Sequence, residues 1–312
     1  MALKAPLVWF GGKSAIAQEV WNRFGNVGYY VEPFMGSMAC LLARPQVGVH
    51  EYVNDVNNYL VNFWRAVKAD PEALFALMDY PVTETDIHVR HNWINGEGVA
   101  RLEPIKTSVD FYDIQTAAWW VWGLCCTIGG TSKWCEGHGA WKIENDKWVK
   151  GKPGLDRQKP GDPRGYLART FTTEQRRQLI VDLSERLKDV IVLCGDWKRT
   201  CSGYFMPTDN VGILLDPPYD NHVGVYGKQT NSMSDEVRVW AIENTDNYKI
   251  ALCGYDGEHD MPKEWSIYRW KAQGGYANTG ADQSNNRRGD EVVWFSPKCN
   301  NEKAIQSQLR LF

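Results

Sequence analysis

The stretch "VGILLDPPYDN", residues 211–221, joins an apolar run directly to an acid, two prolines and a tyrosine. The apolar run 211–215 predicts a buried strand, and the residues after it lie at the strand's carboxyl end. Ligands of open α/β sheets bind at such ends. Asp216 and the carbonyl of Pro217 offer two hydrogen-bond acceptors beside the flat ring of Tyr219, which suits a planar base with an exocyclic amino group. A purely structural turn is the competing interpretation.

Strands and helices alternate on both sides of this stretch. Further strands are expected at 29–31 and 52–53 and in "VIVLCGDW", "YKIALCGYD" and "DEVVWFS". Helices are expected at 14–24 behind a Ser14 cap, near 38–43, as a pair broken near Asp70-Pro71, and at 172–189 behind Thr172 or Thr173. This alternation predicts an α/β fold with a parallel sheet.

The pattern changes between about 81 and 170, where glycine, tryptophan and charge mix without long periodicity. We expect an inserted, partly helical domain there, with a short hairpin or irregular loops in 128–154. The chain has 312 residues and a net charge of -3, and no apolar run is long enough to span a membrane. Its eight cysteines form no CxxC pair and no secretory signal opens the chain, which favours a reducing, cytoplasmic setting.

Small and acidic residues follow the other expected strands. Gly36 in "EPFMGSMA" allows a ligand close to the backbone before a helix. Asp55 suits the hydroxyls of a ribose, about twenty residues further on. Asp196 suits an adenine amino group, and the ring of Trp197 can stack beside it. These strand ends together favour a nucleoside ligand.

The N-terminal stretch "VWFGGK" adds Trp9 and the cation of Lys13, which suits a ligand carboxylate. No GxxxxGK[ST] motif is present, so a phosphate is not obligatory. A ligand with a nucleoside and a carboxylate but no required phosphate corresponds to S-adenosylmethionine.

The segments "WFGGK", "EPFMGSMA", "VNDVNNYLVNFW" and "DPPY" follow one another as in the Dam-like DNA adenine-N6 methyltransferases, and the chain resembles this family over roughly 1–70 and 190–297. The resemblance implies a class I methyltransferase, Rossmann-like fold: a mostly parallel, seven-stranded, doubly wound sheet with an inserted target-recognition domain. It implies a catalytic domain at 1–80 and 190–297, a target-recognition domain at 81–189 and a tail at 298–312.

The resemblance also implies the chemistry, which is methyl transfer from S-adenosylmethionine to N6 of a flipped-out adenine in double-stranded DNA. It implies a bacterium or phage-infected cell, action at the nucleoid, and a restriction–modification setting. The resemblance implies that Trp9 and Lys13 contact the methionine end of the cofactor and that Phe34 and Gly36 shape its pocket. Asp55 would bind the ribose, and Asp196 would lie near the adenine of the cofactor. The target base would be held by Asp216, Pro217 and Tyr219. The inserted region lacks the family's Arg-Asn…Phe-Asn-Val-Pro-like stretch, so recognition of GATC does not follow. An RNA adenine-N6 methyltransferase and a non-catalytic nucleic-acid binder stay open as alternatives.

Six of the 15 tryptophans fall between residues 119 and 148, interleaved further on with basic residues. Trp134, Trp141 and Trp148 recur every seven residues and either stack on bases or fill a small core. Candidate DNA-binding residues are Lys133, Lys142, Lys147 and Lys150, with Arg287 and Arg288 as second candidates. Cys125, Cys126, Cys135 and His138 match no familiar zinc spacing, and no metal site is expected.

The chain ends in "QLRLF", which places three apolar side chains at a free end. The segment resembles the Gln-Leu-x-Leu-Phe peptides that dock bacterial replication proteins on the sliding clamp. Gln308, Leu311 and Phe312 are the expected anchors of such a contact. The competing expectation is a terminal helix or strand docked on the protein's own core.

Overall fold

The computed structural model describes residues 3–7, 9, 11–45, 50–108, 110–126, 142–144, 147–149, 165–168, 170–203, 206–207, 210–218, 230–270 and 291–299. Of residues 84, 142–144, 147–149 and 230–232 it describes the backbone alone. The chain divides into two compact units: unit 1 contains Met1–Gly12 and Asp55–Gly195, and unit 2 contains Lys13–Asn54 and Asp196–Phe312. Each unit is described by itself below.

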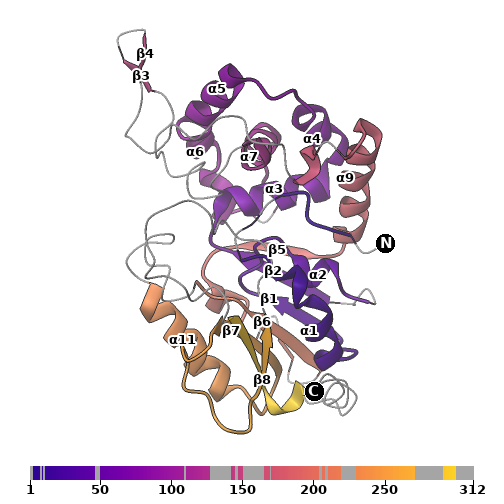
Figure 1. The fold of residues 1–312 in the computed structure, drawn as a ribbon, viewed down its shortest axis with the longest axis vertical. Coiled ribbons are helices and arrows are strands. Elements are labelled where there is room, and N and C mark those ends of the chain that lie inside the picture. The colour runs from indigo at the N-terminus through magenta and orange to yellow at the C-terminus, as the bar shows by residue number, and fades with distance from the viewer. Residues whose placement is uncertain are drawn as a thin grey trace. The chain divides into compact units, whose positions relative to one another are not determined.

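A seven-stranded sheet has the order β5-β2-β1-β6-β7-β9-β8 (Figure 1). Its strands are β1 (Tyr29–Glu32), β2 (His50–Asp55), β5 (Ile191–Cys194), β6 (Val211–Leu215), β7 (Lys249–Tyr255), β8 (Ser266–Trp270) and β9 (Glu291–Phe295). β1 pairs in parallel with β2 and β6, and β6 with β7, whereas β9 is antiparallel to both β7 and β8. The mostly parallel, seven-stranded sheet predicted from the sequence is therefore confirmed.

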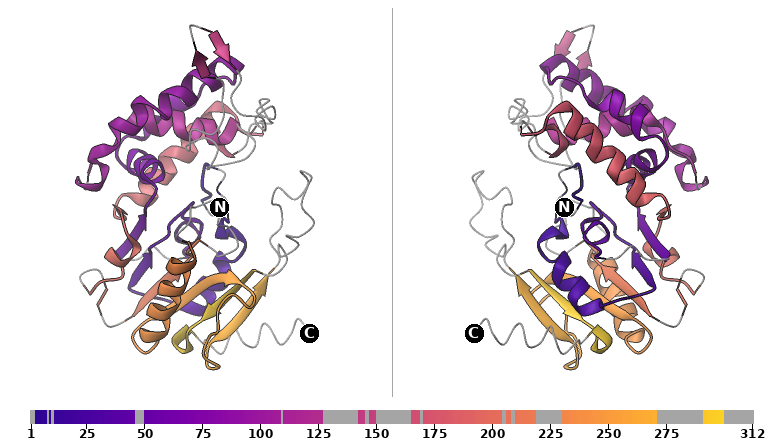
Figure 2. Two further views of the ribbon diagram at one scale, coloured as in Figure 1. Left: turned by 90° about the vertical axis from the view of Figure 1, so that its left-hand side faces the viewer. Right: turned by 90° about the vertical axis from the view of Figure 1, so that its right-hand side faces the viewer.

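Helices of unit 2 cover both faces of its strands. α1 (Ala17–Phe24) lies against the face that Gly212 of β6 presents, because a Cβ atom built on Gly212 would come within 2.9 Å of the Phe24 ring. α11 (Thr230–Glu243) contributes Val237 and Ala241 to the cluster on the opposite face (Figure 2). Side chains alternate across a strand, so the glycine sits where the helix approaches closest and its apolar neighbours face the other way.

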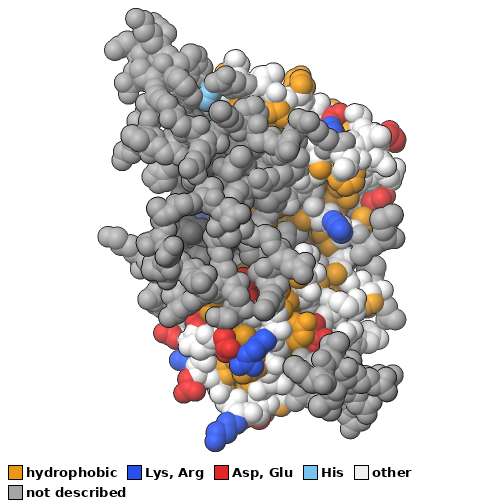
Figure 3. All heavy atoms as spheres, in the orientation of Figure 1, with side chains coloured by type: hydrophobic (Ala, Val, Ile, Leu, Met, Phe, Trp, Pro, Cys, Tyr) orange, Lys and Arg blue, Asp and Glu red, His pale blue; other side chains and the backbone are white. Residues whose placement is uncertain are grey.

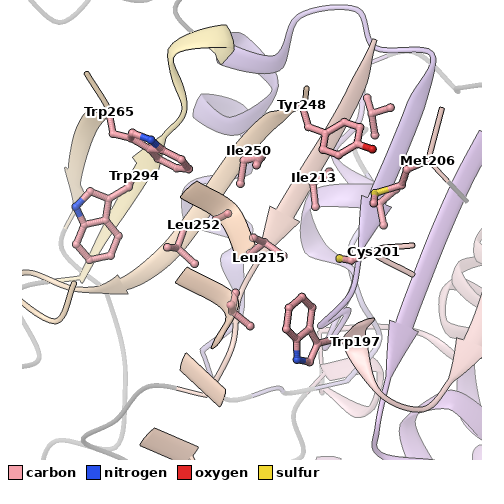
Figure 4. Close-up of a cluster of buried hydrophobic side chains, with 14 of the residues drawn as sticks. Trp197, Cys201, Met206, Ile213, Leu215, Tyr248, Ile250, Leu252, Trp265 and Trp294 are labelled. Atoms are coloured by element: carbon pink, nitrogen blue, oxygen red, sulfur yellow. The ribbon is translucent and has the colours of Figure 1, made fainter. Parts of the chain in front are cut away.

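An apolar cluster of unit 2 forms on the α11 side of these strands. Figure 4 shows Ile213 and Leu215 of β6 beside Ile250 and Leu252 of β7, with Trp197 close to them. These four aliphatic side chains are fully buried. Burying apolar area at about 25 cal/mol per Å² is the main term that stabilises this strand pair.

The helices of unit 1 account for most of its described residues (Figure 1). They are α3 (Asn58–Ala69), α4 (Pro71–Met78), α5 (Glu84–Ile94), α6 (Glu97–Arg101), α7 (Ile114–Cys126) and α9 (Thr173–Leu187), with the short 3-10 helices η2 (Glu103–Lys106) and η3 (Gly165–Leu167). Asp70 separates α3 from α4 and caps α4 through Ala73 N at 3.3 Å, with Pro71 in the first turn. The helix break predicted near Asp70-Pro71 is confirmed.

Arg65 of α3 holds several segments of unit 1 together. Its Nε donates to Val192 O at 3.1 Å, and its Nη1 donates to the carbonyl oxygens of Ile105, Ser108 and Phe111 at 2.9–3.3 Å. The residue is only 6% exposed. A buried guanidinium is tolerated here because backbone carbonyls replace the water that it loses.

Other local expectations have mixed outcomes. Ser14 is not the cap of the first helix: it lies in the 3-10 helix η1 (Lys13–Ala15), and α1 starts later, behind Ile16. Thr172 caps α9 in a capping box with Gln175, as predicted. The short α2 (Ala39–Leu42) confirms the helix near 38–43. β8 was not predicted, because half-buried and exposed residues alternate along it and no apolar run marks it.

The hairpin expected within 128–154 is observed as β3 (Lys142–Glu144) paired antiparallel with β4 (Lys147–Val149). Trp120 and Trp122 of α7 are fully buried, so these two members of the tryptophan cluster belong to the core of unit 1. The two units divide after residues 12, 54 and 195, whereas the expected target-recognition domain, 81–189, remains a prediction. Within the described parts of the chain, no helix combines the length and the apolar character needed to cross a bilayer.

Candidate active site

Asp216 follows β6 immediately, at the carboxyl end of this parallel strand. Its Oδ2 lies 2.8 Å from Nζ of Lys13, which belongs to η1. The Lys13 side chain is 6% exposed and the Asp216 side chain 20%. The lysine predicted to meet a ligand carboxylate therefore forms an ion pair with the acid of the DPPY motif. This pair leaves part of the Asp216 carboxylate accessible.

Further ionisable groups of unit 2 act on this pair. Burial by itself lowers the pKa of Lys13, but the charge of Asp216, together with that of Glu291, outweighs it and raises that pKa above its usual value. Lys13 therefore stays protonated at neutral pH. Burial likewise raises the pKa of the Cys253 thiol, which stays neutral.

Glu32, the last residue of β1, is a fully enclosed acid near the same pair. Burial raises its pKa to about 8, the hydrogen bond from Tyr30 opposes the rise, and the charge of Asp216 adds to it. The Tyr30 hydroxyl donates to Oε2 of Glu32 at 3.1 Å. Glu32 is therefore mostly neutral at pH 7, so it competes little with Asp216 for the charge of Lys13.

The loop after β1 turns sharply where the sequence predicts a ligand pocket. Gly36 has a φ of 45° and Met38 a φ of 53°, both in the left-handed region. The end of β2 supports the loop: Met35 N donates to Asn54 O at 2.8 Å, and Asn54 Nδ2 donates to Pro33 O at 3.0 Å. A non-glycine residue in this region persists because the surrounding bonds hold it there.

Two predicted cofactor residues of unit 2 meet through their rings. The rings of Phe34 and Trp197 lie 6.2 Å apart at an interplanar angle of 30°. Trp197 is 3% exposed and meets Trp240 of α11 edge to face, so it belongs to the core cluster as well. Asp196 is exposed and caps the 3-10 helix η4 (Trp197–Arg199), accepting from Lys198 N at 2.9 Å. The cap explains this acid structurally and leaves its second oxygen for another donor.

The remaining predicted cofactor residues belong to unit 1. Asp55 ends β2 and accepts a hydrogen bond from Asn57 N at 2.9 Å. Trp9 is partly exposed, and its ring lies 6.3 Å from that of Trp120. Their roles in cofactor binding remain predictions.

A pocket of about 510 Å³ lies in unit 2 between η4 and α11. Its lining includes Trp197, Lys198 and Trp240, but neither Lys13 nor Asp216. Acidic and basic side chains mix on the face seen in Figure 3, and Lys198 pairs with Glu236 at 2.7 Å beside this pocket. We place the chemistry at the Lys13–Asp216 pair, because Asp216 belongs to the DPPY motif and the pocket includes neither residue of the pair. In the described part of the chain, no three His, Cys, Asp or Glu side chains gather as a metal site would require.

Several predicted site residues lie outside the described residues: Tyr219, Lys133, Lys150, Arg287, Arg288, Gln308, Leu311 and Phe312, together with Trp134, Trp141, Cys135 and His138. Lys142 begins β3 and Lys147 begins β4, so both belong to the hairpin. A DNA-binding role for either lysine stays a prediction.

The sequence reading missed two acids of this site. Glu32 and Glu291 each interact electrostatically with Lys13 and Asp216. A signal for Glu32 was present, since an acid inside the apolar strand "YYVE" must be paired or neutral once buried. Glu291 opens the strand "EVVWF" and gave no comparable signal.

Comparison with known proteins supports the same chemistry. Residues 9–90 match the family model described as D12 class N6 adenine-specific DNA methyltransferase. The match includes Lys13, Glu32, Gly36 and Asp55. A search among curated proteins finds no match. The family match over residues 9–90 and the mostly parallel seven-stranded sheet together support an enzyme, a DNA adenine methyltransferase of the Dam-like family.

Proposed function

We propose that the protein transfers a methyl group from S-adenosylmethionine to N6 of an adenine flipped out of double-stranded DNA. The observation that carries this proposal is Asp216, a partly exposed carboxylate that Lys13 holds at 2.8 Å at the carboxyl end of β6. A carboxylate fixed in this way is a preorganised acceptor for an amino group.

The residues present fit the cofactor that this family implies. The loop after β1 carries the left-handed Gly36, where backbone can approach a ligand closely, and Phe34 offers a partly exposed ring beside it. We assign Phe34, Gly36, Asp196 and Trp197 to cofactor binding. The roles of Asp55 at the ribose and of Trp9 at the methionine end are proposed from the sequence alone. When bound, S-adenosylmethionine supplies an electrophilic methyl group on a sulfonium.

The chain's own residues perform positioning and charge stabilisation. Asp216 and the carbonyl of Pro217 accept hydrogen bonds from the two N6 hydrogens, which favours a more tetrahedral nitrogen with its lone pair toward the methyl group. Lys13 orients the Asp216 carboxylate through their ion pair. The carboxylate then stabilises the positive charge that develops on N6. We assign to Tyr219 the stacking that offsets part of the cost of flipping the base, about 1–3 kcal/mol.

Transfer of a labelled methyl group to unmethylated plasmid DNA tests this proposal against its alternatives. We expect transfer to DNA, N6-methyladenine after digestion, and no transfer with Asp216→Ala, although that variant still binds the cofactor in calorimetry. Preferential labelling of RNA would favour the RNA methyltransferase. Absence of cofactor binding by the wild-type protein would favour the non-catalytic binder.

Two finer proposals concern partners. We propose that the 81–189 region, including Lys142 and Lys147, selects the DNA site, and that the enzyme works in the cytoplasm at the nucleoid. The sliding-clamp contact through residues 308–312 rests on the sequence motif alone.

A further inference from the structure

The side chain of Asn54, near the end of β2, bonds to the loop that follows β1. The two strands are parallel, and their last paired residues are Glu32 and Val53. Pro33 comes next, and a proline has no N–H group with which to continue the ladder. The Asn54 side chain continues the connection instead, because its Nδ2 donates to Pro33 O at 3.0 Å. Asn54 is 1% exposed, so this bond forms away from water.

A second bond from the same residue lies on the other side of Phe34. Met35 N donates to the backbone carbonyl of Asn54 at 2.8 Å. The carbonyl of Pro33 belongs to the peptide plane before Phe34, and the N–H of Met35 belongs to the plane after it. Each peptide unit is planar, so holding both units fixes the two backbone dihedrals of Phe34. Asn54 therefore sets the direction in which the Phe34 side chain leaves the backbone.

Burial alternates along this loop. Pro33 and Met35, the two residues that Asn54 bonds, are buried, whereas Phe34 and Gly36 are partly exposed. The Phe34 ring lies 6.2 Å from the ring of Trp197. Gly36 has a left-handed φ of 45°, which lets the backbone turn where a ligand would approach it. Asn54 thus grips the inward residues of the loop and leaves the outward ones for a ligand.

The amide of Asn54 supplies what an apolar residue could not. Without Nδ2, the buried carbonyl of Pro33 would lose this donor, and leaving such an oxygen unsatisfied is costly. The loop would then gain by turning Pro33 O toward water, which would move the ring of Phe34 as well. The bond from Met35 N uses the backbone of Asn54 and survives a change of side chain.

We propose that Asn54 is a positioning residue for the cofactor: its two bonds hold the Phe34 ring and the backbone at Gly36 in the arrangement that binds S-adenosylmethionine. This inference rests on the proposed function. Asn54 itself does not touch the cofactor, and it acts by fixing the loop before the cofactor arrives. A loop that is already in its bound form loses less conformational entropy on binding, which raises affinity.

Two asparagines allow a matched comparison. Asn54→Leu keeps the approximate size of the side chain and removes the Nδ2 donor. Asn62→Leu is the control, because Asn62 of α3 is also fully buried. Its Nδ2 donates to Asp113 O at 2.9 Å and its Oδ1 accepts from Asp113 N at 2.7 Å, within unit 1. Both changes remove buried hydrogen bonds, but only Asn54→Leu affects the loop after β1.

The experiment combines calorimetry with S-adenosylmethionine, single-turnover methyl transfer to plasmid DNA and thermal unfolding. We expect Asn54→Leu to weaken cofactor binding about tenfold. Its rate at saturating cofactor should stay within about threefold of wild type, because the loss concerns binding of the cofactor and not the transferred methyl group. Asn62→Leu should lower the melting temperature and leave cofactor affinity unchanged.

A double variant tests whether Asn54 acts through Phe34. Phe34→Ala should also weaken cofactor binding, because it removes the ring that Asn54 positions. Adding Asn54→Leu to Phe34→Ala should then weaken binding less than Asn54→Leu does in the wild-type protein. Fully additive losses would show that the two residues act independently and would overturn the inference.

Wild-type cofactor affinity for Asn54→Leu would likewise overturn the inference while leaving the proposed function intact. If the leucine variant fails to fold, Asn54→Asp decides. Its carboxyl group donates to Pro33 O only while protonated, so its cofactor affinity relative to wild type should fall between pH 6 and pH 8.5. A ratio that stays constant over this range refutes the role. A wild-type protein that binds no S-adenosylmethionine would overturn the proposed function and this inference with it.

Discussion

Replacing Glu32 with glutamine should remove a pH dependence from the stability of the protein. In the folded state burial raises the pKa of Glu32 to about 8, whereas an unfolded chain has the ordinary value of 4.5. Between these values the folded protein holds a proton that the unfolded chain has released. The free energy of unfolding therefore decreases as pH rises through this window and levels off above pH 8.

The size of the effect follows from the shift. One pKa unit corresponds to about 1.4 kcal/mol. Across the two units from pH 5 to pH 7, the Glu32 carboxyl should cost the native state about 3 kcal/mol. Glutamine mimics the protonated acid that β1 encloses, with an amide that can still bond to the Tyr30 hydroxyl. Glu32→Gln should thus match wild type near pH 5 and exceed its stability at pH 7.

Urea unfolding followed by tryptophan fluorescence at pH 5, 6, 7 and 8 measures the difference between the two proteins. We expect this difference to grow by roughly 1.4 kcal/mol per pH unit up to pH 8. Tyr30→Phe is the matched control: it removes a hydrogen bond that lowers the pKa of Glu32, so the window should extend to higher pH. A constant difference between wild type and Glu32→Gln across this range would refute the reasoning.

Four further changes have expected outcomes. Lys13→Met should cost about 3–5 kcal/mol of stability by stranding Asp216, measured by urea unfolding, and should lower methyl transfer; an equally stable, equally active variant would contradict the buried ion pair. Arg65→Met should cost at least about 3 kcal/mol, because four backbone carbonyls lose a charged donor; a melting temperature within a degree of wild type would argue against this. Asp55→Ala should weaken cofactor binding by about 1–3 kcal/mol in calorimetry, and unchanged affinity would remove it from the ribose site. Deleting 308–312 should abolish binding to purified sliding clamp while methylation of plasmid DNA persists; equal clamp binding by both proteins would exclude the motif.

Local features of the fold were predictable because they depend on neighbouring residues. Apolar runs identified β6 and β7, and the Asp70-Pro71 break and the Thr172 cap were readable from the residue types that end and begin helices. The same reasoning failed for β8, because its residues "SIYRW" alternate between half-buried and exposed positions and form no apolar run. It also failed at Ser14, because a 3-10 turn precedes α1 and moves the helix start to Ala17.

The sequence by itself determined the class of fold and the position of the DPPY motif after a buried strand. It also supplied the motifs "WFGGK", "EPFMGSMA" and "VNDVNNYLVNFW", which lie within the family match over 9–90. Only the tertiary structure decided which charges meet: Lys13 reaches Asp216 at 2.8 Å, and Glu32 becomes neutral. The physical reason is that secondary structure follows from local side-chain patterns, whereas the ionisation of an acid depends on burial and on charges brought close by strands distant in the chain.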